Sequence, residues 1–256
     1  MDLNLNGKRV LITGGSKGIG LAAALGFAAE GAEVIIAART AETLAAAREA
    51  IRARHNVPVS IEAIDLAARG NAEALHQRHP DVDILINNAG AIPGGDIAAI
   101  DEAKWREAWE LKVFAYVNLT RAYFAKMRER RHGVIVNVLG MAGVRPTFDY
   151  VAGSTANAGL MAFTRAMGSR SVDHNVRVVA LNPPATATDR LVTLARRRAE
   201  SAFGDPERWQ ETLKNLPFGR PATPEEIADM VVFLASERAS YMSGAVVDIH
   251  GGGAYR

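Results

Sequence analysis

The residues Thr13-Gly14-Gly15-Ser16-Lys17-Gly18-Ile19-Gly20 form the most informative stretch of this sequence. They follow directly on a β-branched apolar run, Arg9–Thr13, and they open an alanine-rich stretch of helical composition. Glycine allows a sharp turn and a close approach of the backbone to a ligand. The N-terminus of the following helix offers unpaired N–H groups and a partial positive charge, which suit a pyrophosphate. Glycines after a strand can also form a tight turn alone, but this position near the start of a strand–helix pattern favours a phosphate-binding turn.

The rest of the chain alternates short Val/Ile-rich runs with longer helix-favouring stretches. The runs predict strands at Arg9–Thr13, Glu33–Ala38, Val57–Ile64, Val82–Asn87, Gly133–Val138, Val176–Leu181 and Ala245–Ile249. Helices are predicted near 18–30, 41–54, 68–78, 101–129, 151–171 and 224–235. Near-continuous Val/Ile runs are typical of parallel strands buried on both faces. The pattern predicts an α/β fold, a Rossmann-type doubly wound parallel sheet of about seven strands with helices on both faces.

No change in composition marks a second domain, so we expect one dinucleotide-binding and catalytic domain over residues 1–256. The segment 190–218 interrupts the strand–helix alternation. It holds Arg196–Arg198, the turn Gly204-Asp205-Pro206 and Trp209. We interpret it as an inserted helical loop that closes over a substrate.

Composition and charge exclude several classes of protein. The chain has no cysteine, which excludes disulfides, thiolate nucleophiles and cysteine metal sites. Its net charge of +2 is too small to predict a nucleic-acid surface. No apolar run approaches the ~18 residues of a membrane span, and no targeting segment is recognisable, so we expect a cytoplasmic protein. The histidines show no metal-ligand spacing, and His76 and His79 are expected on a solvated helix face.

These motifs resemble the short-chain dehydrogenase/reductase family, from about Leu5 to Gly253. The glycine turn is similar to the family's cofactor turn, and three further motifs follow in family order: Asp65-Leu66, Asn87-Asn88-Ala89-Gly90, and Asn182-Pro183 with Thr188. The resemblance implies that Asp65 and Leu66 hold the adenine and that Thr188 contacts the nicotinamide end. The full set of implied cofactor-binding residues is Gly14, Ser16, Lys17, Gly18, Ile19, Gly20, Arg39, Asp65, Leu66, Asn88, Ala89, Gly90, Lys112, Pro183 and Thr188.

The end of the second predicted strand bears on the choice of nicotinamide cofactor. An acidic residue is expected there when the ribose 2′-hydroxyl is recognised, but Ala38 and then Arg39 stand in its place. Lys17 and Arg39 can instead face a 2′-phosphate, which arginine binds with bidentate, charge-assisted bonds. The alternative is that both are solvated surface charges. We predict NADP(H) in preference to NAD(H).

The resemblance fails at the catalytic positions. Members of the family carry an Asn-Ser-Tyr-Lys tetrad, in which the tyrosine is the acid/base and the lysine lowers its pKa and holds the ribose. Register from the motifs on both sides places the tetrad on Lys112, Gly140, Gly153 and Asn157. None of these positions holds its usual residue.

Three residues keep catalysis possible. The amide and the ammonium have exchanged places, with Lys112 where asparagine is expected and Asn157 where lysine is expected. Tyr150 lies three residues before the usual tyrosine, and a cation nearby would favour its phenolate. We therefore predict Tyr150, Lys112 and Asn157 as the catalytic residues. The alternatives are a solvated or interface lysine and a packing tyrosine.

The leading hypothesis is an NADP(H)-preferring oxidoreductase that transfers a hydride to or from a small carbonyl or alcohol. One alternative is a nucleotide-binding sensor or subunit partner that has lost catalysis. A third is an enzyme in which the cofactor alone does the chemistry and water donates the proton. The resemblance also implies a homo-oligomer, a dimer or tetramer paired through the helices near 101–129 and 151–171.

Overall fold

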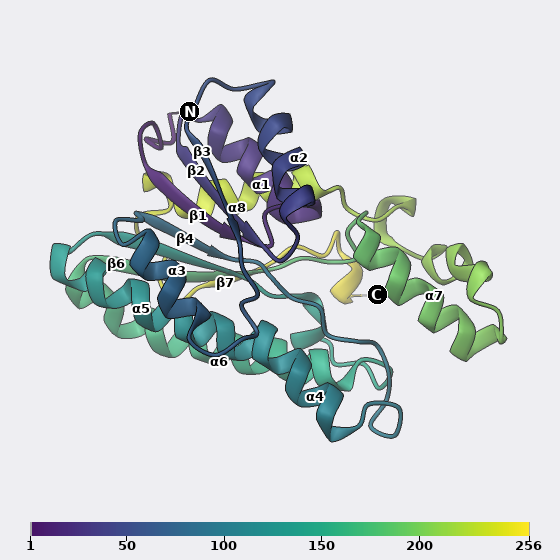
Figure 1. Cartoon of the computed structure of the whole chain (residues 1–256). Coiled ribbons are helices and arrows are strands. Elements are labelled where there is room, and N and C mark those ends of the chain that lie inside the picture. The colour runs from purple at the N-terminus through teal and green to yellow at the C-terminus, as the bar shows by residue number, and fades with distance from the viewer. Residues whose placement is uncertain (1, 256) are drawn as a thin grey trace.

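Seven parallel strands form one sheet in the order β3-β2-β1-β4-β5-β6-β7 (Figure 1). The structure is a computed structural model, and it describes residues 2–255. The strands are β1 (Arg9–Thr13), β2 (Glu33–Ala38), β3 (Val59–Ala63), β4 (Ile84–Asn87), β5 (Gly133–Val138), β6 (Val176–Asn182) and β7 (Val246–Asp248). The predicted Rossmann-type α/β sheet is confirmed.

Helices cover both faces of this sheet. They are α1 (Gly18–Ala29), α2 (Ala41–Arg52), α3 (Asn71–Arg78), α4 (Glu102–Trp109), α5 (Ala115–Arg130), α6 (Val151–Ser171), α7 (Asp189–Phe203) and α8 (Pro224–Ala235). In Figure 1, α1, α2 and α8 lie on one side of the sheet, and α3, α5 and α6 lie on the other. The apolar core is divided in the same way.

Strand β1 illustrates why the core has two halves. Val10 and Ile12 pack into the cluster that includes α1 and α8, whereas Leu11 packs into the cluster that includes α3 and α5. Successive side chains of a strand point to opposite faces, so a strand that is apolar throughout needs cover on both sides.

The observed elements differ from the predicted ones mainly at their ends. The strand predicted to begin at Val57 begins at Val59, because Pro58 has no N–H to donate to the ladder. The helix predicted over 101–129 is two helices, α4 and α5, joined by a π-helical turn at Glu110–Phe114.

The expectation that His76 and His79 face solvent is wrong. The His76 side chain is 12% exposed, and its ring lies edge-on to that of Tyr123 with centroids 4.9 Å apart. His79 is 13% exposed, with Nε2 2.7 Å from Oε1 of Glu62. Helix α3 packs on α5, which covers the side of the helix that carries His76.

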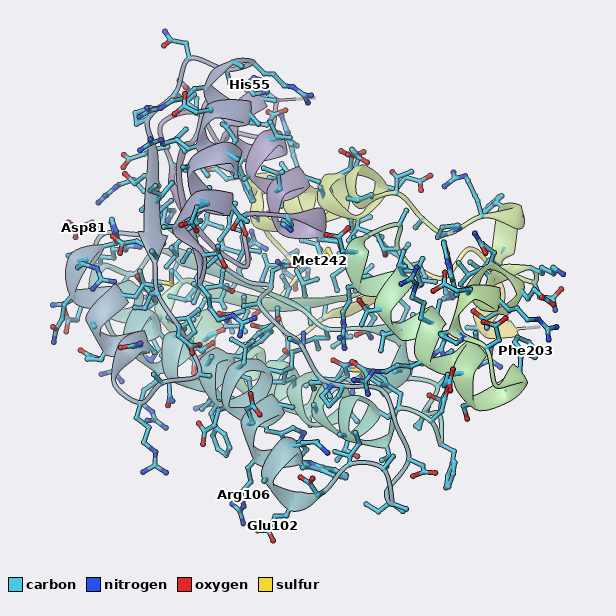
Figure 2. All side chains as sticks on the ribbon, turned by 45° about the vertical axis from the view of Figure 1, so that its right-hand side comes forward. His55, Asp81, Glu102, Arg106, Phe203 and Met242 are labelled. Atoms are coloured by element: carbon cyan, nitrogen blue, oxygen red, sulfur yellow. The ribbon has the colours of Figure 1, made fainter. Side chains whose placement is uncertain are left out.

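The segment 190–218 lies beside the sheet rather than within it. It consists of most of α7, a 3₁₀ turn at Pro206–Leu213 and a second at Pro217–Gly219. Helix α7 projects from the edge where the strands end, and Phe203 at its C-terminal end lies at the periphery of the molecule (Figures 1 and 2).

Candidate functional site

The strand order reverses between β1 and β4, and both loops that follow these strands meet at that point. In doubly wound sheets, such a switch point at the carboxyl ends of the strands is where ligands bind. The backbone N–H of Asn88 donates to Thr13 Oγ1 at 2.9 Å, and its side-chain Nδ2 donates to Thr13 O at 3.0 Å. Asn88 therefore holds the loop after β4 against the end of β1.

Three glycines of the turn after β1 are required by its geometry. Gly14 has φ +67°, and a Cβ atom there would lie 3.0 Å from Asn88 Nδ2. Gly18 has φ +53°, and its Cβ would lie 2.9 Å from Thr188 Cγ2. A Cβ at Gly20 would lie 2.2 Å from the carbonyl oxygen of Gly14, which no side chain can tolerate. Thr188 is thereby placed directly over the turn, although it is distant in sequence.

The first turn of α1 is suited to a pyrophosphate. No side chain caps the N-terminus of α1 at Lys17, and its first turn carries no acidic residue. Its orphan N–H groups and the partial positive charge of the helix end therefore remain available to an anion. Ser16 and Ile19, both half-buried, flank these groups. The residues present fit the phosphates of a dinucleotide.

The residues predicted to recognise a 2′-phosphate lie at the rim of this cleft. Arg39 follows the end of β2 and is exposed, as is Lys17. Lys17 Nζ lies 3.7 Å from Oδ2 of Asp189, and both side chains are mostly exposed. Such an exposed pair is weak and is easily exchanged for another anion.

The other predicted cofactor residues differ in what they offer a ligand. Asp65 is exposed, and its Oδ1 accepts from the N–H of Ala67 at 3.1 Å, whereas Leu66 is 6% exposed. Pro183 is buried, and its carbonyl accepts from the N–H of Met141 at 3.1 Å. Along the loop after β4, Asn88 and Ala89 are half-buried and Gly90 is exposed, as expected for residues that line a cleft.

Tyr150 compensates for the glycine at position 153. A Cβ atom at Gly153 would lie 2.1 Å from the ring of Tyr150 and 2.6 Å from its Oη. The phenol therefore fills the base of the space that a side chain at position 153 would occupy. The hydroxyl of Tyr150 therefore lies nearer to the α6 backbone than the hydroxyl of a tyrosine at position 153 would lie.

Asn157 lies beside the second glycine of the tetrad positions. A Cβ atom at Gly140 would lie 3.0 Å from Asn157 Nδ2. The Oδ1 of Asn157 is buried and accepts no hydrogen bond from any residue that the structure describes. A buried acceptor without a partner is rare in proteins and marks a place where a ligand or a water donates.

Lys112 lies in the π-helical turn, is 7% exposed, and packs its side chain against Gly90. Its Nζ donates to Val138 O at 2.8 Å and to Tyr116 Oη at 2.9 Å. Burial, with a further contribution from Arg190, lowers the pKa of Lys112 to about 7. π-Helical turns are frequent at functional sites, and this one carries the predicted lysine.

Arg190 belongs to the site and was missed by the sequence analysis. It lies in the first turn of α7, its guanidinium donates to the carbonyl of Ile92, and its Nη2 lies 3.5 Å from Tyr150 Oη. The sequence contains no signal for it beyond its nearness to Thr188. Only the position of α7 over the loop after β4 brings Arg190 to the phenol.

The described residues include neither a metal-binding cluster nor a membrane-spanning helix. The described part of the chain holds no group of three or more His, Cys, Asp or Glu side chains placed to bind a metal ion. Among residues 2–255, no helix has both the length and the apolar character that a membrane crossing requires.

Comparison with known proteins identifies the family. Residues 8–199 match the sequence profile of the family described as short chain dehydrogenase. The chain belongs to this family. The short-chain dehydrogenases are oxidoreductases, so the expected family, fold and general reaction class are confirmed.

Individual members of the short-chain dehydrogenase family match the chain along nearly its whole length. It is 34% identical to the uncharacterized oxidoreductase YvrD of Bacillus subtilis, with 98% of each chain covered. The L-sorbose reductase of Gluconobacter frateurii, solved with NADPH and L-sorbose, is 33% identical with a TM-score of 0.87 and 98% coverage of each chain. An NAD⁺-bound xylitol dehydrogenase is 25% identical with a TM-score of 0.90, covering 97% of this chain and 100% of that one.

Proposed function

We propose that this protein is an NADP(H)-preferring oxidoreductase that transfers a hydride between the nicotinamide and a small carbonyl or alcohol. The observation that carries the proposal is the Tyr150 phenol, which lies in the space beside Gly153. A proton-transferring hydroxyl is thus present although the tetrad tyrosine is not. The L-sorbose reductase neighbour, solved with NADPH, supports a carbonyl substrate of this kind.

The bound dihydronicotinamide supplies the hydride of this reaction. The protein orients it: the first turn of α1 holds the pyrophosphate, and Arg39 and Lys17 hold the 2′-phosphate. Neither residue at the end of β2, Ala38 or Arg39, is a carboxylate that would repel that phosphate. This favours NADP(H), whereas the NAD⁺-bound xylitol dehydrogenase neighbour shows that the fold itself serves either cofactor.

The three predicted catalytic residues have separate roles. Tyr150 donates a proton to the carbonyl oxygen in reduction and takes it back in oxidation, as general acid–base catalysis requires. Asn157, at the family lysine position, bonds a ribose hydroxyl through its side-chain amide. Lys112 supports the floor of the cleft through Val138 O and Tyr116 Oη, and it adds positive charge when protonated.

The test of the cofactor assignment is a fluorescence titration of NADPH and NADH. We expect NADPH to bind at least ~10-fold more tightly than NADH to the wild-type protein, a difference of ~1.4 kcal/mol. Arg39→Ala should remove most of this difference and leave NADH binding unchanged, because only the 2′-phosphate is lost as a partner. Equal affinities in the wild-type protein would contradict the NADP(H) preference, and the absence of binding at millimolar concentrations would contradict the oxidoreductase assignment.

We also propose that the chain is one domain and that residues 190–218 close over the substrate.

We further propose that the protein is a homo-oligomer. A groove of about 430 Å³ between α5 and α6 supports this proposal, since it is lined largely by apolar side chains, among them Val117, Phe124, Phe163 and Met167. Light scattering should give the mass of a dimer or tetramer for the wild-type protein and a smaller mass for Phe163→Glu. A monomeric wild type would contradict the proposal.

A further inference from the structure

Arg190 connects three parts of the cleft rim that are distant in sequence. It belongs to the first turn of α7, it donates to the carbonyl of Ile92 in the loop after β4, and it contacts Tyr150 at the start of α6. Its Nη2 lies 3.5 Å from Tyr150 Oη. The family tetrad of Asn, Ser, Tyr and Lys includes no such arginine.

The other charged groups near Tyr150 interact with other residues. Arg197, also on α7, donates to the carbonyl of Gly94 at 3.2 Å. Asp149, the residue before Tyr150, is paired with Arg198 at 3.1 Å. The guanidinium of Arg190 is therefore the cation that contacts the phenol.

Lys112 is a second cation near Arg190, but it bonds other groups. Its ammonium is bonded to Val138 O and Tyr116 Oη. It interacts electrostatically with Arg190, so the two cations are near neighbours, with Arg190 on the side of Tyr150. A guanidinium keeps its charge throughout the working pH range, whereas a buried lysine loses its charge readily.

We propose that Arg190 is a positioning residue for Tyr150, whose guanidinium orients the phenolic oxygen and stabilises negative charge on it in place of the family lysine. The inference rests on the proposed function, in which Tyr150 exchanges a proton with the substrate. In reduction, the O–H bond of Tyr150 breaks and its proton forms a bond to the substrate oxygen, while the carbonyl carbon takes the cofactor's hydride. The phenolate that remains faces the guanidinium, which favours the charged form, and a proton from solvent restores the phenol.

The test follows the ionisation of Tyr150 directly and needs no substrate. Protein labelled with ¹³C at tyrosine Cζ is titrated with base and observed by NMR. The chain has five tyrosines, and burial raises the pKa of Tyr116 and of Tyr123, so their signals move only at high pH. The signal that disappears in Tyr150→Phe belongs to Tyr150.

Removing the cation should make the phenol harder to ionise. We expect the Tyr150 signal to titrate at a higher pH in Arg190→Met than in the wild-type protein, because the cation that faces the phenolate is lost. Arg190→Lys keeps a cation at this position, so the Tyr150 midpoint should lie between those of the wild type and Arg190→Met. Arg197→Met is the matched control. Arg197 lies on the same helix and also donates to a loop carbonyl, so its removal should leave the Tyr150 midpoint unchanged.

Two results would overturn the inference. One is an unchanged midpoint in an Arg190→Met protein whose circular dichroism matches that of the wild type. The other is an equal shift in Arg190→Met and Arg197→Met, which would assign the effect to the packing of α7. The proposed function fails on a different result, unchanged turnover in Tyr150→Phe, so the two failures are distinguishable.

Discussion

At the scale of single residues, neighbouring side chains occupy the spaces beside the two glycines at tetrad positions. The Tyr150 ring fills the space at Gly153, and Asn157 Nδ2 lies beside Gly140. The substitutions at Gly153 and Tyr150 are therefore coupled, because a side chain at 153 and the present position of Tyr150 exclude each other. Such coupling makes the effect of a change at one position depend on the other.

Gly153→Ala tests this coupling. The added Cβ would lie 2.1 Å from the Tyr150 ring, so we expect the phenol to be displaced and the protein to lose ~1–3 kcal/mol of stability. Turnover should fall while the affinity for NADPH is kept, because the glycine turn is not touched. Gly159→Ala, in the same helix with open space around its Cβ, should be neutral or stabilising by up to ~1 kcal/mol. Full activity in Gly153→Ala would show that the position of Tyr150 is not required.

Lys112 should make the stability of the fold depend on pH. Burial lowers its pKa from 10.5 to about 7, so the folded protein disfavours the charged form that the unfolded chain keeps. Between these two pH values the unfolded chain binds more protons, and the free energy of unfolding rises with pH.

Denaturant titrations of the wild type and Lys112→Met measure this contribution. Other titrating groups cancel in the difference between the two proteins. We expect the free energy of unfolding of the wild type to rise relative to that of Lys112→Met as pH rises above about 7. The rise should be at most ~1.4 kcal/mol per pH unit. Parallel pH dependences in the two proteins would show that Lys112 remains charged in the folded state.

At the scale of elements, the sequence predicted regular structure well and the contacts between elements poorly. β1, β2, β5 and α6 were predicted with their observed bounds, because glycine, proline and Val/Ile runs act locally. The π-helical turn at Glu110–Phe114 was not predicted, since the sequence analysis treated 101–129 as one uninterrupted helix. Arg190 was missed for a different reason: its role depends on where α7 lies in space.

The turn between β1 and α1 is the element that we propose to hold the pyrophosphate of the cofactor. Gly20→Ala places a Cβ 2.2 Å from Gly14 O and must open the turn, so we expect the affinity for NADPH to fall by ~10-fold or more. Gly26→Ala is a control in the same helix, where the Cβ meets only Val232 Cγ2 at 3.0 Å. Unchanged NADPH affinity in Gly20→Ala would remove the turn from the cofactor site.

At the scale of the whole molecule, the doubly wound sheet brings the parts of the cleft together. The glycine turn, the loop after β4, the start of α6 and the first turn of α7 are separated in sequence. Contacts between neighbouring pairs of these segments nevertheless join them in the folded chain, whose elements Figure 1 shows. Other polar groups lie away from these segments: the exposed ion pair of Glu102 and Arg106 on α4 lies at the periphery of the molecule (Figure 2). The glycine turn and the loop that meets it could be predicted from local motifs, whereas the contact between Arg190 and Tyr150 could be seen only in the assembled fold.

We propose that Tyr150 transfers the proton in a site that lacks the tetrad tyrosine. The measurement is steady-state oxidation of NADPH by wild type and Tyr150→Phe, with a panel of small carbonyls that includes ketoses. NADPH affinity is measured on both proteins by fluorescence. We expect the wild type to reduce at least one ketone, and Tyr150→Phe to lose ~100-fold or more in kcat/KM with unchanged NADPH affinity. Equal kcat/KM in the two proteins would contradict this role of Tyr150.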